Sequence, residues 1–163
     1  MAFENLPDES RIWIYGFDRP LESDQYRIVK ERLDRFKNEW LYHGNSVTGD
    51  YDIIENQFVI IATNEAISGC SIDSSVAVFK EFKYELDLDA LNQNLVYFRD
   101  NTKIRTVSRA EFQELVNNGQ VNEDTIVFNL LINHLGSLKR GNFETAFKNS
   151  WHCKAFKIPQ EVS

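Results

Sequence analysis

The sequence predicts a folded protein of the α+β class, and three observations lead to this prediction. Its 163 residues include 12 Phe, 6 Tyr and 3 Trp, and such large rings bury enough area for a core without disulfides or metal. Segments with the alternation of strands are interleaved with segments of helical periodicity. Charged residues make up 26% of the chain and hydrophobic residues 42%, which is typical of globular rather than disordered proteins.

The N-terminal part predicts a strand, a long helix and a hairpin. The first strand runs from Arg11 to Tyr15 and is apolar on both faces. A helix is predicted from Ser23 to Tyr42, because bulky apolar residues recur every three or four positions and Ser23 is a good N-cap. Tyr51–Glu55 and Phe58–Thr63 are rich in Ile, Val and aromatic residues and are separated by two residues, which predicts a tight hairpin without a glycine in its turn.

A second helix and a second hairpin follow. The apolar residues of this helix recur at helical spacing behind Ser71, which we expect to be its N-cap. They are Ile72, Val76, Phe79, Phe82 and Leu86. Leu95–Arg99 and Lys103–Val107 are predicted to pair as a second hairpin.

The C-terminal part begins with a short helix. Ser108 and Glu111 form a Ser-x-x-Glu capping box, and Gly119 ends the helix that they begin. Thr125–Leu131 is predicted as a sixth strand, and Asn142–Lys148 as one or two further helical turns.

The order of these elements favours a particular fold. From Arg11 to Arg99 it is β-α-β-β-α-β, the ferredoxin-like arrangement in which two helices cover one face of an antiparallel sheet. A C-terminal β-α-β extension would follow. We therefore expect a part covering residues 1–93 and a smaller part covering residues 94–163, or one continuous domain. The pattern leaves open whether Leu95–Arg99 completes the first sheet or opens a second one.

Composition and missing motifs exclude several function classes. The net charge of −7 argues against a general nucleic-acid surface, and no apolar run approaches the roughly 20 residues that span a bilayer. The first ten residues lack the basic and apolar layout of a secretory signal, and two cysteines fit a reducing cytoplasm, where we expect the protein. No glycine is followed by lysine, so a P-loop is missing and ATPase activity is not expected. Rossmann and esterase glycine motifs are missing too.

The most distinctive polar segment is Ser68-Gly69-Cys70-Ser71, which leads into the second helix. Backbone N–H groups at a helix N-terminus favour an anion and lower the pKa of a thiol, so Cys70 could be a nucleophile or part of an anion site. The alternative is structural: Ser71 caps the helix, Gly69 makes the turn and Cys70 is a small buried residue.

A thiol nucleophile needs a base, and the candidates are His43, His134 and His152. Their positions in the sequence do not place any of them near Cys70. Three His and two Cys also suggest zinc, but no Cys-x-x-Cys or His-Glu-x-x-His spacing occurs, so we expect no metal site. His43 follows a helix, where a cation near the C-terminus is favourable.

Two charged groups have both a functional and a structural interpretation. Acidic residues gather at the end of the second helix, either as a carboxylate site or as a solvated surface. They are Glu81, Glu85, Asp87 and Asp89. Basic residues from Arg99 to Arg109 lie beside Tyr97 and Phe98, either to bind single-stranded nucleic acid or as the outer face of an amphipathic hairpin.

Several motifs together resemble a family of short bacterial proteins of unknown function that are often labelled "ABC transporter ATPase". The resemblance covers most of the chain. It rests on Ser10-Arg11-Ile12-Trp13-Ile14-Tyr15, His43-Gly44, the segment from Ser68 to Val76, Thr125-Ile126-Val127-Phe128-Asn129 and Ser150-Trp151-His152. The family implies no catalytic residue that can be carried over to this chain.

A second similarity covers residues from Leu95 to about Trp151. Two strands, a Ser-x-x-Glu-Phe-x-x-Leu-Val-x-x-Gly segment from Ser108, Asp124-Thr125-Ile126-Val127-Phe128 and a later Trp resemble bacterial GYF-like modules. Relatives of these modules dock proline-rich peptides on aromatic clusters. The Gly-Pro-Phe and Gly-Tyr-Phe signatures of the peptide-binding family do not occur in this chain.

The leading hypothesis is a non-catalytic cytoplasmic module that binds a protein or peptide and needs no cofactor. The alternative is a thiol-dependent enzyme or small-anion binder at Gly69-Cys70-Ser71, with Cys70, His43 and His152 as candidate catalytic residues. The candidate binding residues are Ser68, Gly69, Cys70, Ser71, Trp151 and His152. We expect neither a membrane nor nucleic acid as a partner.

Overall fold

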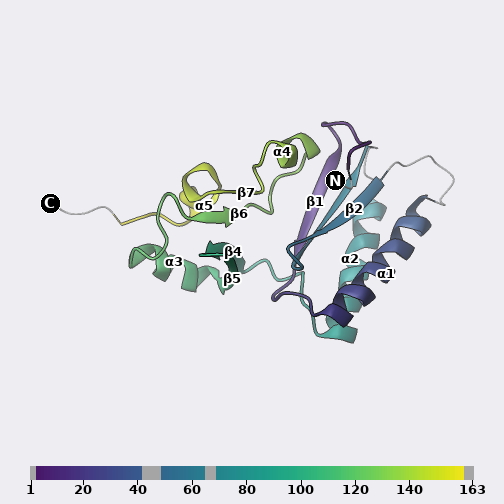
Figure 1. Ribbon diagram of the computed structural model, residues 1–163, viewed down its shortest axis with the longest axis horizontal. Coiled ribbons are helices and arrows are strands. Elements are labelled where there is room, and N and C mark those ends of the chain that lie inside the picture. The colour runs from purple at the N-terminus through teal and green to yellow at the C-terminus, as the bar shows by residue number, and fades with distance from the viewer. Residues whose placement is uncertain (1–2, 42–48, 65–68, 160–163) are drawn as a thin grey trace. The chain divides into compact units, whose positions relative to one another are not determined.

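A computed structural model describes residues 3–41, 49–64 and 69–159, without the side chains of residues 40–41 and 69–72. It is an α+β structure with 37% of residues in helices and 26% in strands, as predicted (Figure 1). The strands are β1 (Arg11–Gly16), β2 (Gly49–Ile54), β3 (Phe58–Thr63), β4 (Leu95–Asp100), β5 (Lys103–Ser108), β6 (Ile126–Phe128) and β7 (Glu144–Ala146). The helices are α1 (Ser23–Leu41), α2 (Gly69–Leu86), α3 (Arg109–Asn117), α4 (Leu135–Lys139), the 3-10 turn η1 (Phe147–Asn149) and α5 (His152–Ala155).

The chain divides into two compact units. Unit 1 consists of Met1–Asn92 and Leu130–Arg140, and unit 2 of Gln93–Asn129 and Gly141–Ser163. The boundary after Asn92 lies close to the one expected at residue 93. The sequence pattern did not predict that the segment Leu130–Arg140, which we call the excursion, leaves unit 2 and returns to unit 1.

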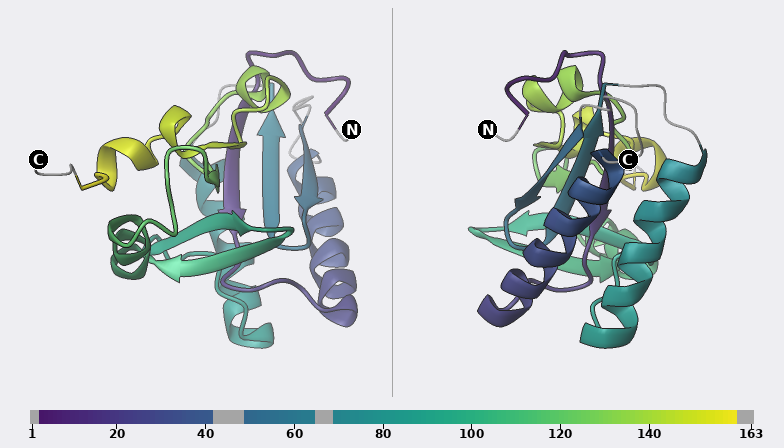
Figure 2. Two further views of the ribbon diagram at one scale, coloured as in Figure 1. Left: turned by 60° about the vertical axis from the view of Figure 1, so that its left-hand side comes forward. Right: turned by 90° about the vertical axis from the view of Figure 1, so that its right-hand side faces the viewer.

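Unit 1 is a three-stranded antiparallel sheet in the order β1-β3-β2, with α1 and α2 on one face (Figure 2). The predicted hairpin β2–β3 is present, and its turn uses Glu55 and Asn56 at φ angles of 57° and 52° instead of a glycine. Apolar side chains of the two helices and of one sheet face form the main core. They include Val29, Leu33 and Phe36 of α1, Val78, Phe79 and Phe82 of α2, and Tyr15, Val59 and Ile61 of the sheet.

The opposite face of this sheet has a core of its own. Successive side chains of a strand point to opposite faces, so Ile12, Ile60 and Ala62 lie on the side away from the helices. Phe3 and Leu6 of the N-terminal arm and Leu135 of the excursion complete this core. All six residues of β3 are therefore buried, whereas in β1 the inner part is only half-buried at Trp13 and Ile14.

The structure does not confirm a ferredoxin-like core. The order β1-β3-β2 matches the split β-α-β arrangement, but the fourth strand that would lie beside β1 is missing from the described part of this sheet. The strand predicted at Leu95–Arg99 is β4, which pairs with β5 and β6 in the other sheet. At the edge of β1, Ile12 N–H instead donates to the carbonyl of Asn133, and Leu135 N–H donates to that of Ser10.

The excursion is also held by the N-terminal arm. Gly136 N–H donates to the Asp8 carbonyl at 2.8 Å, and Lys139 Nζ lies 3.1 Å from the Asp8 carboxylate. A Cβ at position 136 would lie 3.2 Å from the Asp8 Cβ, so any larger residue would require the arm to shift by a few tenths of an ångström. The excursion thus supplies core, edge and polar contacts to unit 1.

Unit 2 is a four-stranded antiparallel sheet in the order β5-β4-β6-β7, with α3 against one face. Phe112 of α3 is fully buried at the centre of its core, at 5.6 Å from the ring of Phe98 and 4.8 Å from that of Phe156. The remaining core residues are Val96, Val107, Val116, Val121, Val127 and Phe147.

Helix boundaries confirm one predicted cap and correct two. The side chain of Ser108 accepts a hydrogen bond from Glu111 N–H, and Gly119 follows α3 at a φ of 81°. α1 already begins at Ser23, so the residue before it, Glu22, is the cap, and its N–H is bound by Gln25 Oε1. α2 begins at Gly69, which places Ser71 inside the first turn.

The last third of the chain differs most from the prediction. The sixth strand is limited to Ile126–Phe128, and the helix expected at Asn142–Lys148 is replaced by β7 and η1. β7 has three residues, too few to show an alternating pattern, and it is formed by pairing with β6. Tertiary pairing therefore overrides the weak local signal.

Candidate functional site

The predicted site residues are distributed over both units. Trp151 and His152 belong to unit 2 and are described in full. His43 and Ser68 lie outside the described residues, as do the side chains of Cys70 and Ser71. The thiol or anion hypothesis at this segment therefore stays a prediction from the sequence.

Trp151 and His152 pack with residues of α3. We call Arg109, Phe112, Trp151, His152 and Phe156 the Trp151 cluster. Ser108 begins α3 and thereby fixes Arg109 and Phe112 one turn apart on the side that meets the C-terminal segment. α5 closes with a hydrogen bond from Phe156 N–H to the His152 carbonyl, which brings the rings of the C-terminal segment together.

His152 is buried and electrically neutral. Its side chain is 1% exposed, its ring stacks on Trp151 with centroids 4.0 Å apart, and its Nδ1 lies 2.7 Å from Ser150 Oγ. Burial, followed by the charge of Arg109, lowers the pKa of His152 from 6.5 to about 4. An imidazole with this pKa is a weak base near neutral pH, so the geometry favours packing over proton transfer.

This pKa makes stability depend on pH. Between pH 6.5 and about 4, His152 binds a proton in the unfolded chain but not in the folded protein. The free energy of unfolding therefore falls as the pH falls through this window. The loss reaches about 3 kcal/mol near pH 4 and becomes small above pH 6.5, where the unfolded imidazole is also mostly neutral. Urea unfolding of the wild type and of His152→Asn between pH 8 and pH 4 measures it: the stability advantage of the wild type should shrink towards pH 4. Parallel pH profiles would contradict the expectation.

Trp151 is the aromatic member of the Trp151 cluster that is only partly buried. The guanidinium of Arg109 lies over its ring at 5.2 Å from the centroid and over the ring of Phe156 at 5.3 Å. Its indole Nε1 is buried and has no hydrogen-bond partner among the described residues. A buried donor without an acceptor costs about 1–3 kcal/mol, so an acceptor supplied by a ligand would recover this energy.

The two other arginines of the predicted hairpin are paired with acids, whereas Lys103 is exposed and makes no ion pair among the described residues. Arg99 pairs with Glu144, and Arg105 Nη1 lies 3.6 Å from the carboxylate of Asp100. Both guanidinium groups also lie over phenylalanine rings. Arg109 differs, because it is exposed and no ion pair joins it to any acid in the described part of the chain.

The acidic cluster at the end of α2 contributes to ion pairs. Glu81 binds Arg32 of α1, with Nε at 2.7 Å, and this hydrogen bond lowers the pKa of Glu81. Asp89 lies 3.9 Å from Lys83 Nζ. These contacts favour the solvated, structural interpretation. Among the described residues, no group of three or more His, Cys, Asp or Glu side chains is arranged to hold a metal ion.

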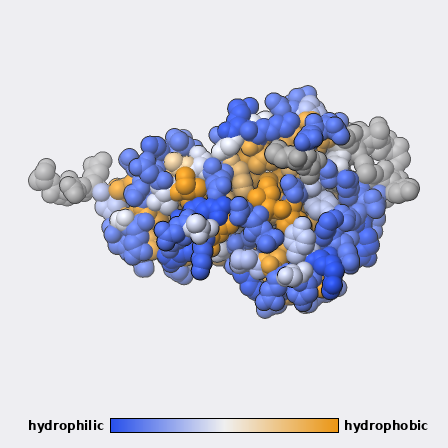
Figure 3. All heavy atoms as spheres, in the orientation of Figure 1, coloured by the Kyte–Doolittle hydropathy of each residue, from blue (hydrophilic) through white to orange (hydrophobic). Residues whose placement is uncertain are grey.

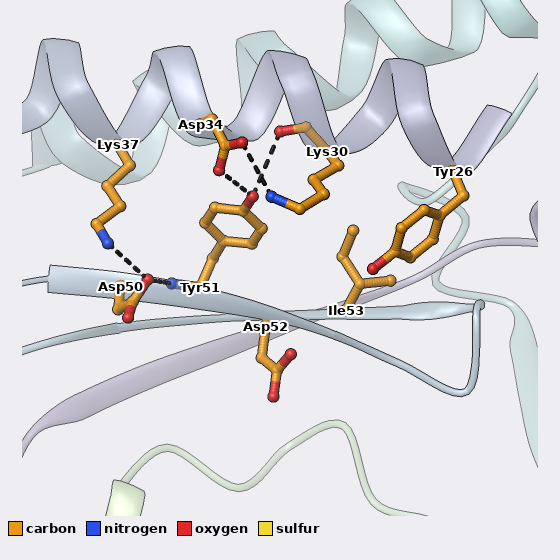
Figure 4. A pocket seen from close by; sticks show the side chains of 8 residues that line it. All are labelled: Tyr26, Lys30, Asp34, Lys37, Asp50, Tyr51, Asp52 and Ile53. Atoms are coloured by element: carbon orange, nitrogen blue, oxygen red, sulfur yellow. Dashed lines mark hydrogen bonds and ion pairs between the residues drawn. The ribbon is translucent and has the colours of Figure 1, made fainter. Parts of the chain in front are cut away.

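A polar hollow of about 230 Å³ between α1 and β2 is a feature that the sequence did not predict (Figure 4). Its centre is Tyr51, whose hydroxyl donates to the carboxylate of Asp34 and lowers the pKa of that group. Lys30 and Lys37 neutralise Asp34 and Asp50 at 3.0 and 3.1 Å. Four of the charged groups of the hollow are thus paired with one another. Asp52, the remaining carboxyl group of the lining, makes no ion pair among the described residues, and burial raises its pKa.

Two of the sequence motifs meet inside unit 1. Trp13 Nε1 donates to Ser75 Oγ at 3.2 Å, and the hydroxyl of Tyr15 lies 2.7 Å from the same oxygen. Ser75 is fully buried, so this serine of the Ser68–Val76 segment anchors α2 to β1. His134, the third candidate base, is exposed at the start of α4, and its backbone bridges to Arg11.

Comparison with known proteins gives no relative. No protein-family model, no curated protein and no solved structure matches this chain. The two family resemblances therefore stay predictions. In the part of the chain that the structure describes, no helix has the length and apolar character needed to cross a membrane.

Proposed function

We propose that the protein is a cytoplasmic, non-catalytic module that binds an extended peptide on the Trp151 cluster of unit 2. The observation that carries the proposal is the partly buried Trp151 ring, with an indole N–H that lacks a partner among the described residues and an exposed arginine over it. The similarity of Leu95–Trp151 to GYF-like modules, whose relatives bind proline-rich peptides, supports the same class of ligand.

Proline-rich segments suit such a surface. They adopt polyproline II structure before binding, so little conformational entropy is lost, and their rings pack against aromatic side chains. Their carbonyls have no internal hydrogen bonds and can accept one from an indole N–H. Because the Trp151 N–H is buried, binding a ligand carbonyl there requires a small local shift of the atoms that cover it.

Of the Trp151 cluster only Arg109 and part of Trp151 are accessible, which sets the expected affinity. In the view of Figure 3, hydrophilic side chains cover most of unit 2 and leave only small apolar areas between them. An interface of this kind belongs to the weak, transient class, so we expect a dissociation constant of about 100 µM.

Binding is tested by titrating the full-length, ¹⁵N-labelled protein with a proline-rich peptide of about ten residues. The indole N–H signal of Trp151, assigned with Trp151→Phe, should move saturably, and Trp151→Ala should weaken binding at least about tenfold.

Tyr84→Ala is the matched control, because Tyr84 is an aromatic residue on α2 that is 88% exposed. It should bind the peptide like the wild type. A Trp151 signal that does not move at millimolar peptide, or an equal loss in Tyr84→Ala, would refute the proposed function. Circular dichroism establishes that each variant is folded.

A further inference from the structure

We infer that the Trp151 cluster selects acidic peptides, with an Asp or Glu carboxylate of the ligand bound by Arg109 beside the Trp151 ring. This inference rests on the proposed function and names the partner more closely. It follows from the distribution of unpaired charge, the fixed position of the arginine and the coverage of the tryptophan ring.

Charge is distributed unevenly over the chain. Unit 2 contains as many basic as acidic residues, so the whole net charge of −7 resides on unit 1. Within unit 2, three acidic residues near the sheet are neutralised by ion pairs. These pairs are Arg99–Glu144, Arg105–Asp100 and Lys148–Asp124. The described cations left without an ion pair include Arg109, Lys154 and Lys157.

Arg109 contacts the Trp151 cluster directly, and the two lysines lie close to Trp151 and Phe156 in the sequence. Arg109 lies over Trp151 and Phe156, and Lys154 and Lys157 are exposed on and just after α5. Gln113, one turn after Arg109, donates to the Lys157 carbonyl, so this side of α3 faces the C-terminal segment.

The unpaired acids of α3 point elsewhere. At about 100° per residue, Glu111 and Glu114 lie about 160° and 140° around the helix from Arg109. They therefore leave the positive field beside Trp151 uncompensated. A carboxylate from a ligand is the group that complements it.

The guanidinium of Arg109 is oriented for such a carboxylate before a ligand binds. Its guanidinium rests on two rings at 5.2 and 5.3 Å, which restricts its rotamers before a ligand arrives. The planar fork of N–H donors at its exposed end matches both oxygens of a carboxylate. Lysine at the same position would offer a point charge without this geometry.

A peptide fits the surface better than a nucleobase. Stacking needs an open aromatic face, but the Trp151 ring is stacked by His152 at 4.0 Å and covered by Arg109. A base would have to displace one of them, whereas a peptide can use the ring edge and the guanidinium together.

The test compares three labelled proline-rich peptides of equal length, which differ only in carrying two Glu, two Gln or two Lys residues. Fluorescence anisotropy with the full-length protein measures binding. We expect the Glu peptide to bind about tenfold more tightly than the Gln peptide and the Lys peptide to bind most weakly. Arg109→Gln should bring the Glu peptide to within about threefold of the Gln peptide.

Arg105→Gln is the matched control, because Arg105 also lies over an aromatic ring but is paired with Asp100. It should keep the preference for Glu. Equal binding of the Glu and Gln peptides, or an equal loss in both arginine variants, would overturn the inference and leave the proposed function standing. If none of the peptides binds, both fail. Tighter binding of a single-stranded oligothymidylate than of the Glu peptide would also overturn it.

Discussion

Replacing Phe112 by alanine should cost about 4 kcal/mol of stability and unfold unit 2 before unit 1. The ring is fully buried and contacts Phe98, Phe147, His152 and Phe156, so its removal leaves a cavity that the surrounding rings cannot fill. The side chain also connects α3 to both the sheet and the C-terminal segment. Its loss should therefore disperse the Trp151 cluster.

Urea unfolding combined with amide hydrogen exchange measures this effect. Amides of β4 and β6 should lose protection more than those of β3. Glu114→Ala, an exposed change on the same helix, should alter the free energy of unfolding by less than about 0.5 kcal/mol. A cost below about 1 kcal/mol for Phe112→Ala would mean that the core of unit 2 does not depend on this ring.

Leu135→Ala should destabilise unit 1 by about 3 kcal/mol, although the residue lies in sequence between two segments of unit 2. Leu135 is fully buried in the core on the far face of the β1-β3-β2 sheet, together with Ile12, Ile60 and Phe3. Its backbone N–H also holds the edge of β1 through Ser10. Loss of the side chain weakens both contacts.

Leu131→Ala is the control within the excursion, because Leu131 is 68% exposed. It should change the free energy of unfolding by less than about 0.5 kcal/mol. In Leu135→Ala the amides of β1 and β3 should exchange faster than those of β4 and β5. The opposite pattern would show that the excursion does not stabilise unit 1.

The candidate site was partly visible in the sequence. Trp151 and His152 belong to a motif and were predicted as binding residues, but the sequence assigned Arg109 to a basic hairpin instead of to this pair. No local spacing connects Arg109 with Trp151, because only the tertiary packing of unit 2 brings α3 and the C-terminal segment together. The burial of His152 was equally hidden, since a histidine near the end of a chain carries no signal of its solvent exposure.

Among the polar contacts of unit 1, too, some are indicated by the sequence and others depend on the tertiary structure. Lys30 and Asp34 are an i,i+4 pair on α1 that the sequence could have suggested. The hydrogen bond from Tyr51 to Asp34 could not be foreseen, because it depends on how α1 lies across β2. Likewise, Ser75 is part of a motif, but its role as the shared hydrogen-bond partner of Trp13 and Tyr15 depends on the packing of α2.

The sequence by itself determined the elements whose signals are local. Apolar periodicity defined α1 and α2, alternation and β-branched residues defined the hairpins β2–β3 and β4–β5, and the Ser108 cap began α3. Only the tertiary structure decided which sheet β4 joins, that Leu130–Arg140 returns to β1, and that Arg109 meets Trp151. These outcomes depend on the summed energy of contacts between distant segments, and a short segment such as 133–135, which adds two backbone hydrogen bonds and one buried leucine, leaves no pattern along the chain.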